Sequence, residues 1–250
     1  YQPLNQNLQR LFPEYEEYEI TDSLTIEEYM KAHGISFKYD NSCVKDYEFN
    51  KDIYESVIQY HRKLIACMVS MQNTSYFKNV FNRKSCINLE ILDNEKFITE
   101  KGDKLNKTEV IELVGMLGFN TEAFSEHELK YITGGWFEEF VYQKIKSELN
   151  IPDKNIALNV QIEKEKDKNE LDVIYIKDNR LHVIECKSFV DGKDGNIVLN
   201  NALYKLQAIM KSKFGLNAKS YLYTQSPVEK DTPLNRAAEF GIQIVDGSQL

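Results

Sequence analysis

The chain has 250 residues and a formal net charge of -8, with 42% hydrophobic and 28% charged residues. This is the composition of an ordinary globular protein with material for one large domain or two small ones, and it excludes low-complexity and fibrous chains. No apolar run approaches the ~20 residues that a membrane-spanning helix needs, so we expect no membrane partner. The overall charge neither favours nor excludes a ligand with a phosphate backbone.

The cysteines are scattered along the chain, at Cys43, Cys67, Cys86 and Cys186. This spacing argues against a zinc site and a disulfide scaffold, and it favours a reducing cytoplasm as the location. The chain opens on Tyr1 rather than on methionine, so we expect it to be a fragment of a longer protein.

Residues 1–127 are expected to form a mainly helical N-terminal region. Apolar side chains at helical spacing predict helices at Leu24–His33, Asn50–Gln72 and Lys107–Leu117. Thr25 is expected to cap the first of them. A short hairpin is expected from Ile87–Leu92 and Lys96–Thr99. Helices with a small hairpin are compatible with a winged-helix module.

Residues 128–250 are expected to form a mixed α/β domain. The patterns predict the order α-β-β-β-α-β-α-β, which packs naturally as a small mixed sheet flanked by helices. The helices are expected at Trp136–Leu149, Leu199–Phe214 and Leu234–Phe240. The strands are expected at Ala157–Glu163, Leu171–Lys177, Arg180–Cys186, Ser220–Thr224 and Ile242–Asp246, with a loop at Asp191–Asn196.

A two-residue turn is predicted between the second and third of these strands. Asp178 and Asn179 both tolerate the positive φ angles that such a turn requires. If these two residues form the loop, Lys177 pairs with Arg180, and the numbers of every pair along the hairpin add up to 357. The register of the whole hairpin then follows from the turn.

This register places Asp172 directly opposite Glu185 and Glu170 opposite Lys187. Because strand side chains alternate, Glu185 and Lys187 share one face. Two carboxylates ~4–5 Å apart repel by about 4 kcal/mol at an effective dielectric of ~20. This repulsion is far larger than the stabilisation that a favourable cross-strand pair provides. Either one acid is protonated, or Lys187 offsets the charge, or a divalent cation lies between the two acids.

The third alternative, a divalent cation between the two acids, provides a mechanism for catalysis. A hard cation such as Mg²⁺ takes oxygen ligands from one or two carboxylates and keeps several waters. It lowers the pKa of a bound water and stabilises charge on a phosphate oxygen, while Lys187 can orient the nucleophile or neutralise the transition state. The competing interpretation is an exposed hairpin end in which Lys187 forms a salt bridge with Glu185 or Glu170. His182 is expected to be a packed or exposed strand residue rather than a ligand.

These residues resemble the PD-(D/E)xK signature of restriction-endonuclease-like nucleases, with Asp172 as the first acid and Glu185-Cys186-Lys187 as the second part. The α-β-β-β-α-β order from Trp136 to Thr224 is also similar to the core of that superfamily. The resemblance implies that Asp172 and Glu185 hold Mg²⁺ or Mn²⁺ and that Lys187 is catalytic.

A narrower resemblance rests on the segments Thr133–Glu139, Asn169–Val173 and Ile184–Lys187. Together they are similar to CRISPR-associated ancillary nucleases, which join an N-terminal cyclic-oligoadenylate sensor, a CARF domain, to a C-terminal nuclease domain. The resemblance covers about residues 128–250, and Leu24–Gly34 resembles the connecting region of that family.

The family implies a homodimer that cuts DNA or RNA in antiviral defence. The superfamily often adds a helix acid, which here is Glu138 or its neighbour Glu139. A first-turn glutamate is also favoured by the helix dipole alone. Gln207 matches a position that sometimes contacts substrate, although a surface role is the more common one. Residues 1–130 lack the strand–helix alternation of a sensor, so cyclic oligoadenylate is expected as a partner only through a domain outside this chain.

Two rival functions stay open at this stage. One is a catalytically inactive nucleic-acid-binding module with the nuclease fold. The other is a winged-helix interaction module whose function lies in residues 1–127.

Overall fold

The computed structural model describes residues 7–10, 16–19, 23–53, 55, 58–99, 101–164, 167–188, 190, 195–214, 218–229 and 231–249. By their contacts the residues divide into two units. The sheet unit contains residues 1–42, 141–186 and 190–250, and the helical unit contains residues 43–140 and 187–189. Among the described residues, no helix combines the length and the apolar character needed to cross a membrane.

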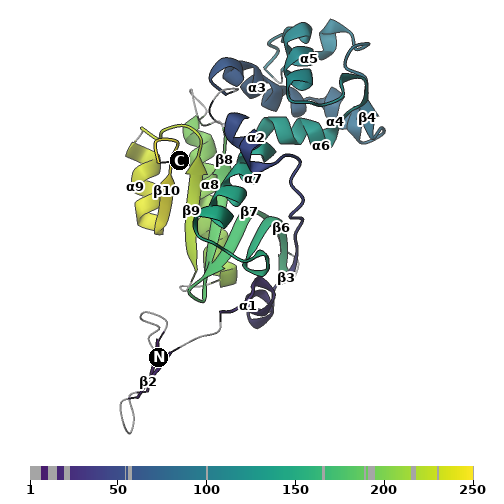
Figure 1. Cartoon of the computed structure of the whole chain (residues 1–250). Helices are drawn as coiled ribbons and strands as arrows, with labels where there is room; N and C mark the ends of the chain where they lie inside the picture. Colours follow the sequence, from purple (N-terminus) through teal and green to yellow (C-terminus); the bar gives the residue numbers. More distant parts are fainter. Residues whose placement is uncertain are drawn as a thin grey trace. The chain divides into compact units, whose positions relative to one another are not determined.

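A six-stranded mixed sheet forms the centre of the sheet unit, in the order β10-β9-β8-β7-β6-β3 (Figure 1). Its strands are β3 (Ser36–Lys38), β6 (Ile156–Lys164), β7 (Asp167–Lys177), β8 (Arg180–Lys187), β9 (Lys219–Thr224) and β10 (Ile242–Val245). Strand β6 pairs antiparallel with β3 and with β7, and β7 pairs antiparallel with β8. Strand β10 pairs parallel with β9. The predicted mixed α/β class is confirmed. The edge strand β3 was not predicted, because three residues with an exposed–half-buried–exposed pattern are too short for a periodicity argument.

The helices of the sheet unit are α1 (Ile26–Ala32), α8 (Gly195–Ile209) and α9 (Asp231–Phe240). One apolar core joins them to strands β6 to β10. The predicted cap is confirmed, since the Thr25 side chain accepts from Glu28 N and Glu28 reaches back to Thr25 N.

A separate two-stranded pair near the start of the chain consists of β1 (Asn7–Arg10) and β2 (Glu16–Glu19).

Helix α8 begins earlier than predicted. Residues 191–194 of the expected loop lie outside the described residues, but Gly195 and Asn196 already belong to the helix. Glycine is required at this start because a Cβ at Gly195 would overlap the carbonyl of Val190. At its other end α8 continues into a π-helical turn, Met210–Phe214.

The helical unit contains α2 (Tyr47–Asp52), α3 (Ile58–Gln72), α4 (Ser75–Phe81), α5 (Lys107–Met116), α6 (Glu126–Lys130) and the π-helical segment η4 (Tyr131–Gly135). Helix α7 (Trp136–Glu148) follows η4 directly, and its residues from Val141 onward belong to the sheet unit. The predicted single helix Asn50–Gln72 is wrong at its start: Asp46 caps α2 by accepting from Phe49 N. Residues 54, 56 and 57, between α2 and α3, lie outside the described residues.

The predicted hairpin between residues 87 and 99 is also wrong. Strand β4 (Cys86–Ile87) pairs instead with β5 (Phe124–Ser125), and Asn94–Lys96 forms a 3₁₀ turn. Leu89 and Phe97 are fully buried, so burial of these side chains, rather than a strand ladder, determines the path of this segment.

Candidate active site

The hairpin of β7 and β8 has the predicted turn and register. Asp178 and Asn179 have φ angles of 52° and 54°, the values of a type I′ turn. The ladder runs from Lys177↔Arg180 to Val173↔Ile184, as predicted. Continuing this register by one position brings Asp172 opposite Glu185.

The Asp172 carboxylate is held at that position by the backbone of the neighbouring strand. Asp172 is 8% exposed, and its Oδ2 accepts a hydrogen bond of 2.6 Å from Cys186 N. Since this nitrogen is bonded to the carbonyl carbon of Glu185 at ~1.33 Å, Oδ2 lies within about 4 Å of the Glu185 backbone. A side-chain acceptor thus replaces the next ladder bond at this point.

Strand β6 is also distorted beside Asp172. Leu158 pairs with Val173 and Val160 pairs with Leu171, and Asn159 between them has a φ of 52°. This left-handed conformation costs an L-residue energy, and such residues cluster at functional sites. The backbone of β6 therefore departs from regular strand geometry at Asn159, between the residues that pair with Leu171 and Val173.

The Glu185 carboxylate is paired with a lysine that the sequence analysis did not consider. Glu185 is 2% exposed, and its Oε2 lies 2.7 Å from Lys205 Nζ of α8. This ion pair partly compensates the two buried acids, so the three predicted ways of compensating them were incomplete. A signal was present in the sequence: Lys205 stands at the helical spacing of Ala202 and Ile209, both buried, where an ammonium needs an acidic partner.

Lys187 and Glu138 belong to the helical unit, and their catalytic roles stay predictions. Lys187 is the half-buried last residue of β8. The next residue, Ser188, donates from Oγ to the carbonyl of Thr133 in η4 at 3.4 Å. The described β7–β8 ladder ends at Val173↔Ile184, so the expected pairing of Glu170 with Lys187 also stays a prediction.

The two glutamates of the first turn of α7 differ in their surroundings. Glu138 is half-buried, whereas Glu139 is 5% exposed. Glu139 accepts from Val44 N at 2.7 Å, from Lys45 N at 3.3 Å and from Asn50 Nδ2 at 3.2 Å. Burial raises the pKa of Glu139, and these hydrogen bonds act in the opposite direction. This network gives Glu139 a structural task and favours Glu138 as the helix acid.

His182 is a packed strand residue, in agreement with the prediction. Its ring stacks on Tyr175 with centroids 4.3 Å apart, and Nδ1 lies 3.0 Å from Tyr221 Oη. Burial, followed by the positive charges of Lys219 and Arg180, lowers the pKa of His182 to about 4. The imidazole is therefore neutral at pH 7.

The acid pair fits a hard divalent cation by its chemistry. Mg²⁺ and Mn²⁺ prefer oxygen ligands and need only one or two carboxylates when waters complete the shell. Asp172 and Glu185 supply two buried carboxylates at neighbouring strand positions. In the part of the chain that the structure describes, no group of three or more His, Cys, Asp or Glu side chains is placed so that it could hold a metal ion.

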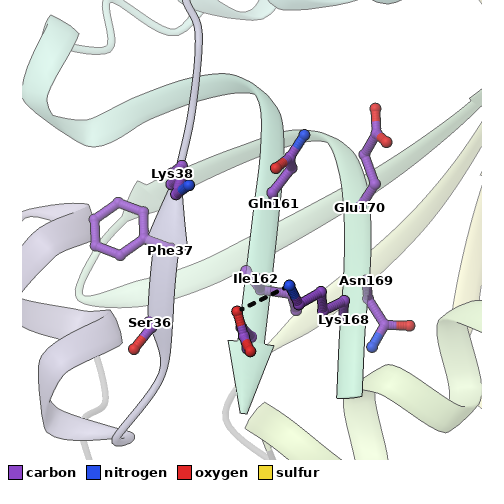
Figure 2. Close-up of a pocket in the computed structure, with 9 residues that line it drawn as sticks. Ser36, Phe37, Lys38, Gln161, Ile162, Lys168, Asn169 and Glu170 are labelled. Atoms are coloured by element: carbon purple, nitrogen blue, oxygen red, sulfur yellow. Dashed lines mark ion pairs between the residues drawn. The ribbon is translucent and has the colours of Figure 1, made fainter. Parts of the chain in front are cut away.

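A cavity of about 440 Å³ lies elsewhere in the sheet unit, across β3, β6 and β7 (Figure 2). Its charged side chains are Lys38, Glu163, Lys168 and Glu170, and Lys168 pairs with Glu163 at 3.7 Å. Among the described residues that line it, none is a candidate catalytic residue. The chemistry of the acid pair, rather than this cavity, therefore identifies the site.

A mixed sheet that carries two buried acids, one of them paired with a helix lysine, is compatible with a nuclease domain. A model of the "Card1-like, endonuclease domain" matches residues 125–250, and a model of the "Card1 hinge domain" matches residues 40–127. The chain therefore belongs to the Card1-like endonuclease family, and a hinge domain precedes the endonuclease domain. This confirms the predicted resemblance to the nuclease region of CRISPR-associated nucleases.

Solved structures share the fold over the whole chain. Protein VC1899 from Vibrio cholerae matches with a TM-score of 0.64 and 19% identity over 99% of this chain and 64% of its own. Can2 from Sulfobacillus thermosulfidooxidans, solved in complex with cyclic tetra-adenylate (cA4), matches with a TM-score of 0.67 and 23% identity over 99% of this chain and 65% of its own. The chain thus spans less than two thirds of either protein. A comparison with curated protein sequences gave no match.

Proposed function

We propose that this chain is a divalent-metal-dependent endonuclease that hydrolyses phosphodiester bonds of DNA or RNA in CRISPR-associated defence. The observation that carries the proposal is the Asp172 carboxylate, bonded at 2.6 Å to the backbone nitrogen next to buried Glu185. Burying two carboxylates in this part of the hairpin costs free energy. The cost is explained if the pair serves to hold a cation.

The residues of the chain divide the work of hydrolysis. Asp172 and Glu185 hold Mg²⁺ or Mn²⁺, and Cys186 N orients Asp172. When bound, the cation supplies positive charge at the phosphate oxygen and lowers the pKa of a nearby water. Lys187 would orient the attacking water and neutralise the charge that builds up on phosphorus, and Glu138 is the proposed helix acid. The water oxygen forms the new bond to phosphorus and gives up one proton, the ester P–O bond breaks, and the leaving oxygen takes up a proton in exchange.

Cleavage of single- and double-stranded DNA and RNA with Mn²⁺, with and without a chelator, tests the proposal. Glu185→Gln keeps the shape of the side chain and removes its charge, so cleavage should be lost. Glu170→Gln is the matched control, since Glu170 is an exposed acid two residues before Asp172 and should be replaceable. Cleavage by wild type in excess chelator, or full cleavage by Glu185→Gln, would contradict the proposal.

The rival function is binding without cleavage, located in residues 1–127 or in an inactive nuclease fold. It requires that wild type binds nucleic acid and does not cleave any substrate with Mn²⁺ or Mg²⁺. Binding that is unchanged in Asp172→Asn combined with Glu185→Gln would then locate the function outside the acid pair.

Regulation and assembly extend the proposal. Because Can2 was solved with cA4, we propose that a cyclic oligoadenylate acts through a sensor domain outside these 250 residues, in a cytoplasmic homodimer. Calorimetric titration of this chain with cA4 should give no binding, and sedimentation of the longer protein should give a dimer. Tight binding of cA4 to the 250-residue chain would overturn this assignment.

A further inference from the structure

Lys205 is the cation that the structure places at the candidate metal site. The Glu185 side chain is 3% exposed, and Lys205 Nζ lies 2.7 Å from its Oε2. An ionised carboxylate this deeply buried needs a counter-charge. Lys205 supplies one from a different element, helix α8, and not from the strand that carries the Glu-x-Lys motif.

The Lys205 side chain is anchored at one end and accessible at the other. Its backbone lies in α8 between Leu203 and Leu206, which are fully buried. Its side chain is nevertheless 37% exposed, and four flexible methylene groups separate the ammonium from the helix. The ammonium can therefore leave Glu185 for solvent without any movement of the helix.

A divalent cation and the ammonium compete for the same oxygen. Each carboxylate oxygen has about two lone-pair sites, and a cation bound to Oε2 at ~2.0–2.2 Å uses one that could accept from a lysine. Two positive charges on one carboxylate oxygen also repel each other strongly in a buried site. Binding of a cation at Oε2 therefore weakens the contact with Lys205 and favours its withdrawal.

We propose that Lys205 is an exchangeable counter-cation. It neutralises Glu185 when no metal is bound, and it gives up Oε2 when a divalent cation loads. This inference rests on the proposed function, since it takes Glu185 as a metal ligand. It makes Lys205 a positioning residue that sets both the stability of the metal-free protein and its affinity for the metal.

Binding of Mn²⁺ alone, without nucleic acid, tests this inference. Lys205→Met keeps an unbranched side chain, one heavy atom shorter than lysine, and removes its charge. Calorimetric titration should give a Kd for Mn²⁺ that is lower than that of wild type by roughly tenfold or more. Lys205→Met should also melt at a lower temperature than wild type in chelator, and Mn²⁺ should restore much of that loss. Lys211→Met is the matched control, since Lys211 is exposed in the turn after α8 and should change neither quantity.

The outcomes separate this inference from the proposed function. If wild type binds Mn²⁺, Glu185→Gln does not, and Lys205→Met binds with the wild-type Kd, the counter-cation inference is overturned and the metal site stands. If wild type binds no Mn²⁺, both fail. Lys205→Gln covers the case in which Lys205→Met does not fold, because its amide still donates to Glu185 without a positive charge. A Kd tightened at least about threefold in Lys205→Gln supports the inference, and an unchanged Kd overturns it.

Discussion

Two buried glutamates, one in each unit, solve the same electrostatic problem in different ways. Glu139 of the helical unit is 5% exposed and is held by two backbone N–H groups and the amide of Asn50. Glu185 of the sheet unit is 2% exposed and pairs with the ammonium of Lys205. The first acid is stabilised by neutral donors in fixed positions, and the second by a charge on a flexible chain.

The difference separates an acid that holds the fold together from an acid available for chemistry. Backbone N–H groups cannot leave, so Glu139 has no way to accept a metal without breaking the contact between α7 and the segment before α2. A lysine side chain can leave, so Glu185 can exchange one cation for another. Burial alone therefore does not distinguish the two acids, whereas the nature of their partners does.

The largest expected effect is on cleavage, in variants of Asp172. Asp172→Asn and Asp172→Ala should both lower kcat by about a thousandfold or more, since a metal ligand is lost. They should differ in stability. Asn keeps an acceptor for Cys186 N, whereas Ala leaves this N–H without one at a cost of about 1–3 kcal/mol. Urea unfolding compared with cleavage kinetics checks both points, and near wild-type kcat in Asp172→Asn would remove this residue from the metal site.

The reverse result is expected at Glu139. Glu139→Ala removes the acceptor of Val44 N and Lys45 N and one of the two acceptors of Asn50 Nδ2, which also donates to the Lys45 carbonyl. The free energy of unfolding should therefore fall by about 3 kcal/mol. The Kd for Mn²⁺, measured by titration on the folded protein, should stay as in wild type. Glu139→Gln keeps one acceptor oxygen and should lose less stability. If Glu139→Gln is fully stable but no longer binds Mn²⁺, Glu139 is a metal ligand, and the distinction drawn between Glu139 and Glu185 is wrong.

The hairpin could be predicted in detail because its turn is determined by local chemistry. Asp178 and Asn179 tolerate positive φ, and the register from Lys177↔Arg180 to Val173↔Ile184 follows from them. The length of β6 to β8 and the apolar residues on both faces of β7 and β8 made these strands predictable for the same reason. Such features depend on residues that are close in sequence.

Features that depend on distant residues were missed. Strand β3 pairs with residues of β6 that lie more than 120 positions later in the sequence. Strand β4 pairs with β5, and helix α5 lies between these two strands in the sequence. Lys205 meets Glu185 only because α8 packs on the sheet. Glu138 and Glu139 could not be distinguished by sequence, since Asn50 and the backbone at Val44 and Lys45 decide between them.

His182 extends the comparison to a buried base, and the expected effect is a change of stability with pH. Its pKa is about 4 in the folded protein and ~6.5 when unfolded. The unfolded state therefore binds more protons between these values, and stability that is present above about pH 6.5 is lost as pH falls toward 4. The loss contributed by His182 is up to about 3 kcal/mol.

His182→Phe should remove this contribution, because a phenyl ring keeps the stacking on Tyr175 and cannot bind a proton. The measurement is the free energy of unfolding against pH for wild type minus the variant, which should slope between about pH 6.5 and 4. A flat difference for His182→Phe would mean that the folded protein tolerates a charged imidazole there.

The smallest expected effect tests whether the distortion of β6 serves the acid pair. Asn159 has a φ of 52°, which costs alanine roughly 1 kcal/mol and glycine nothing. Asn159→Ala should therefore be less stable than Asn159→Gly by about 1 kcal/mol. If the strand relaxes to avoid this cost, Asp172 opposite it moves and cleavage falls severalfold. Asn150, with a φ of 54° after α7, is the matched control: Asn150→Ala should lose similar stability and keep full cleavage. Equal losses of cleavage in the two alanine variants would show that the kink at Asn159 has no special connection with Asp172.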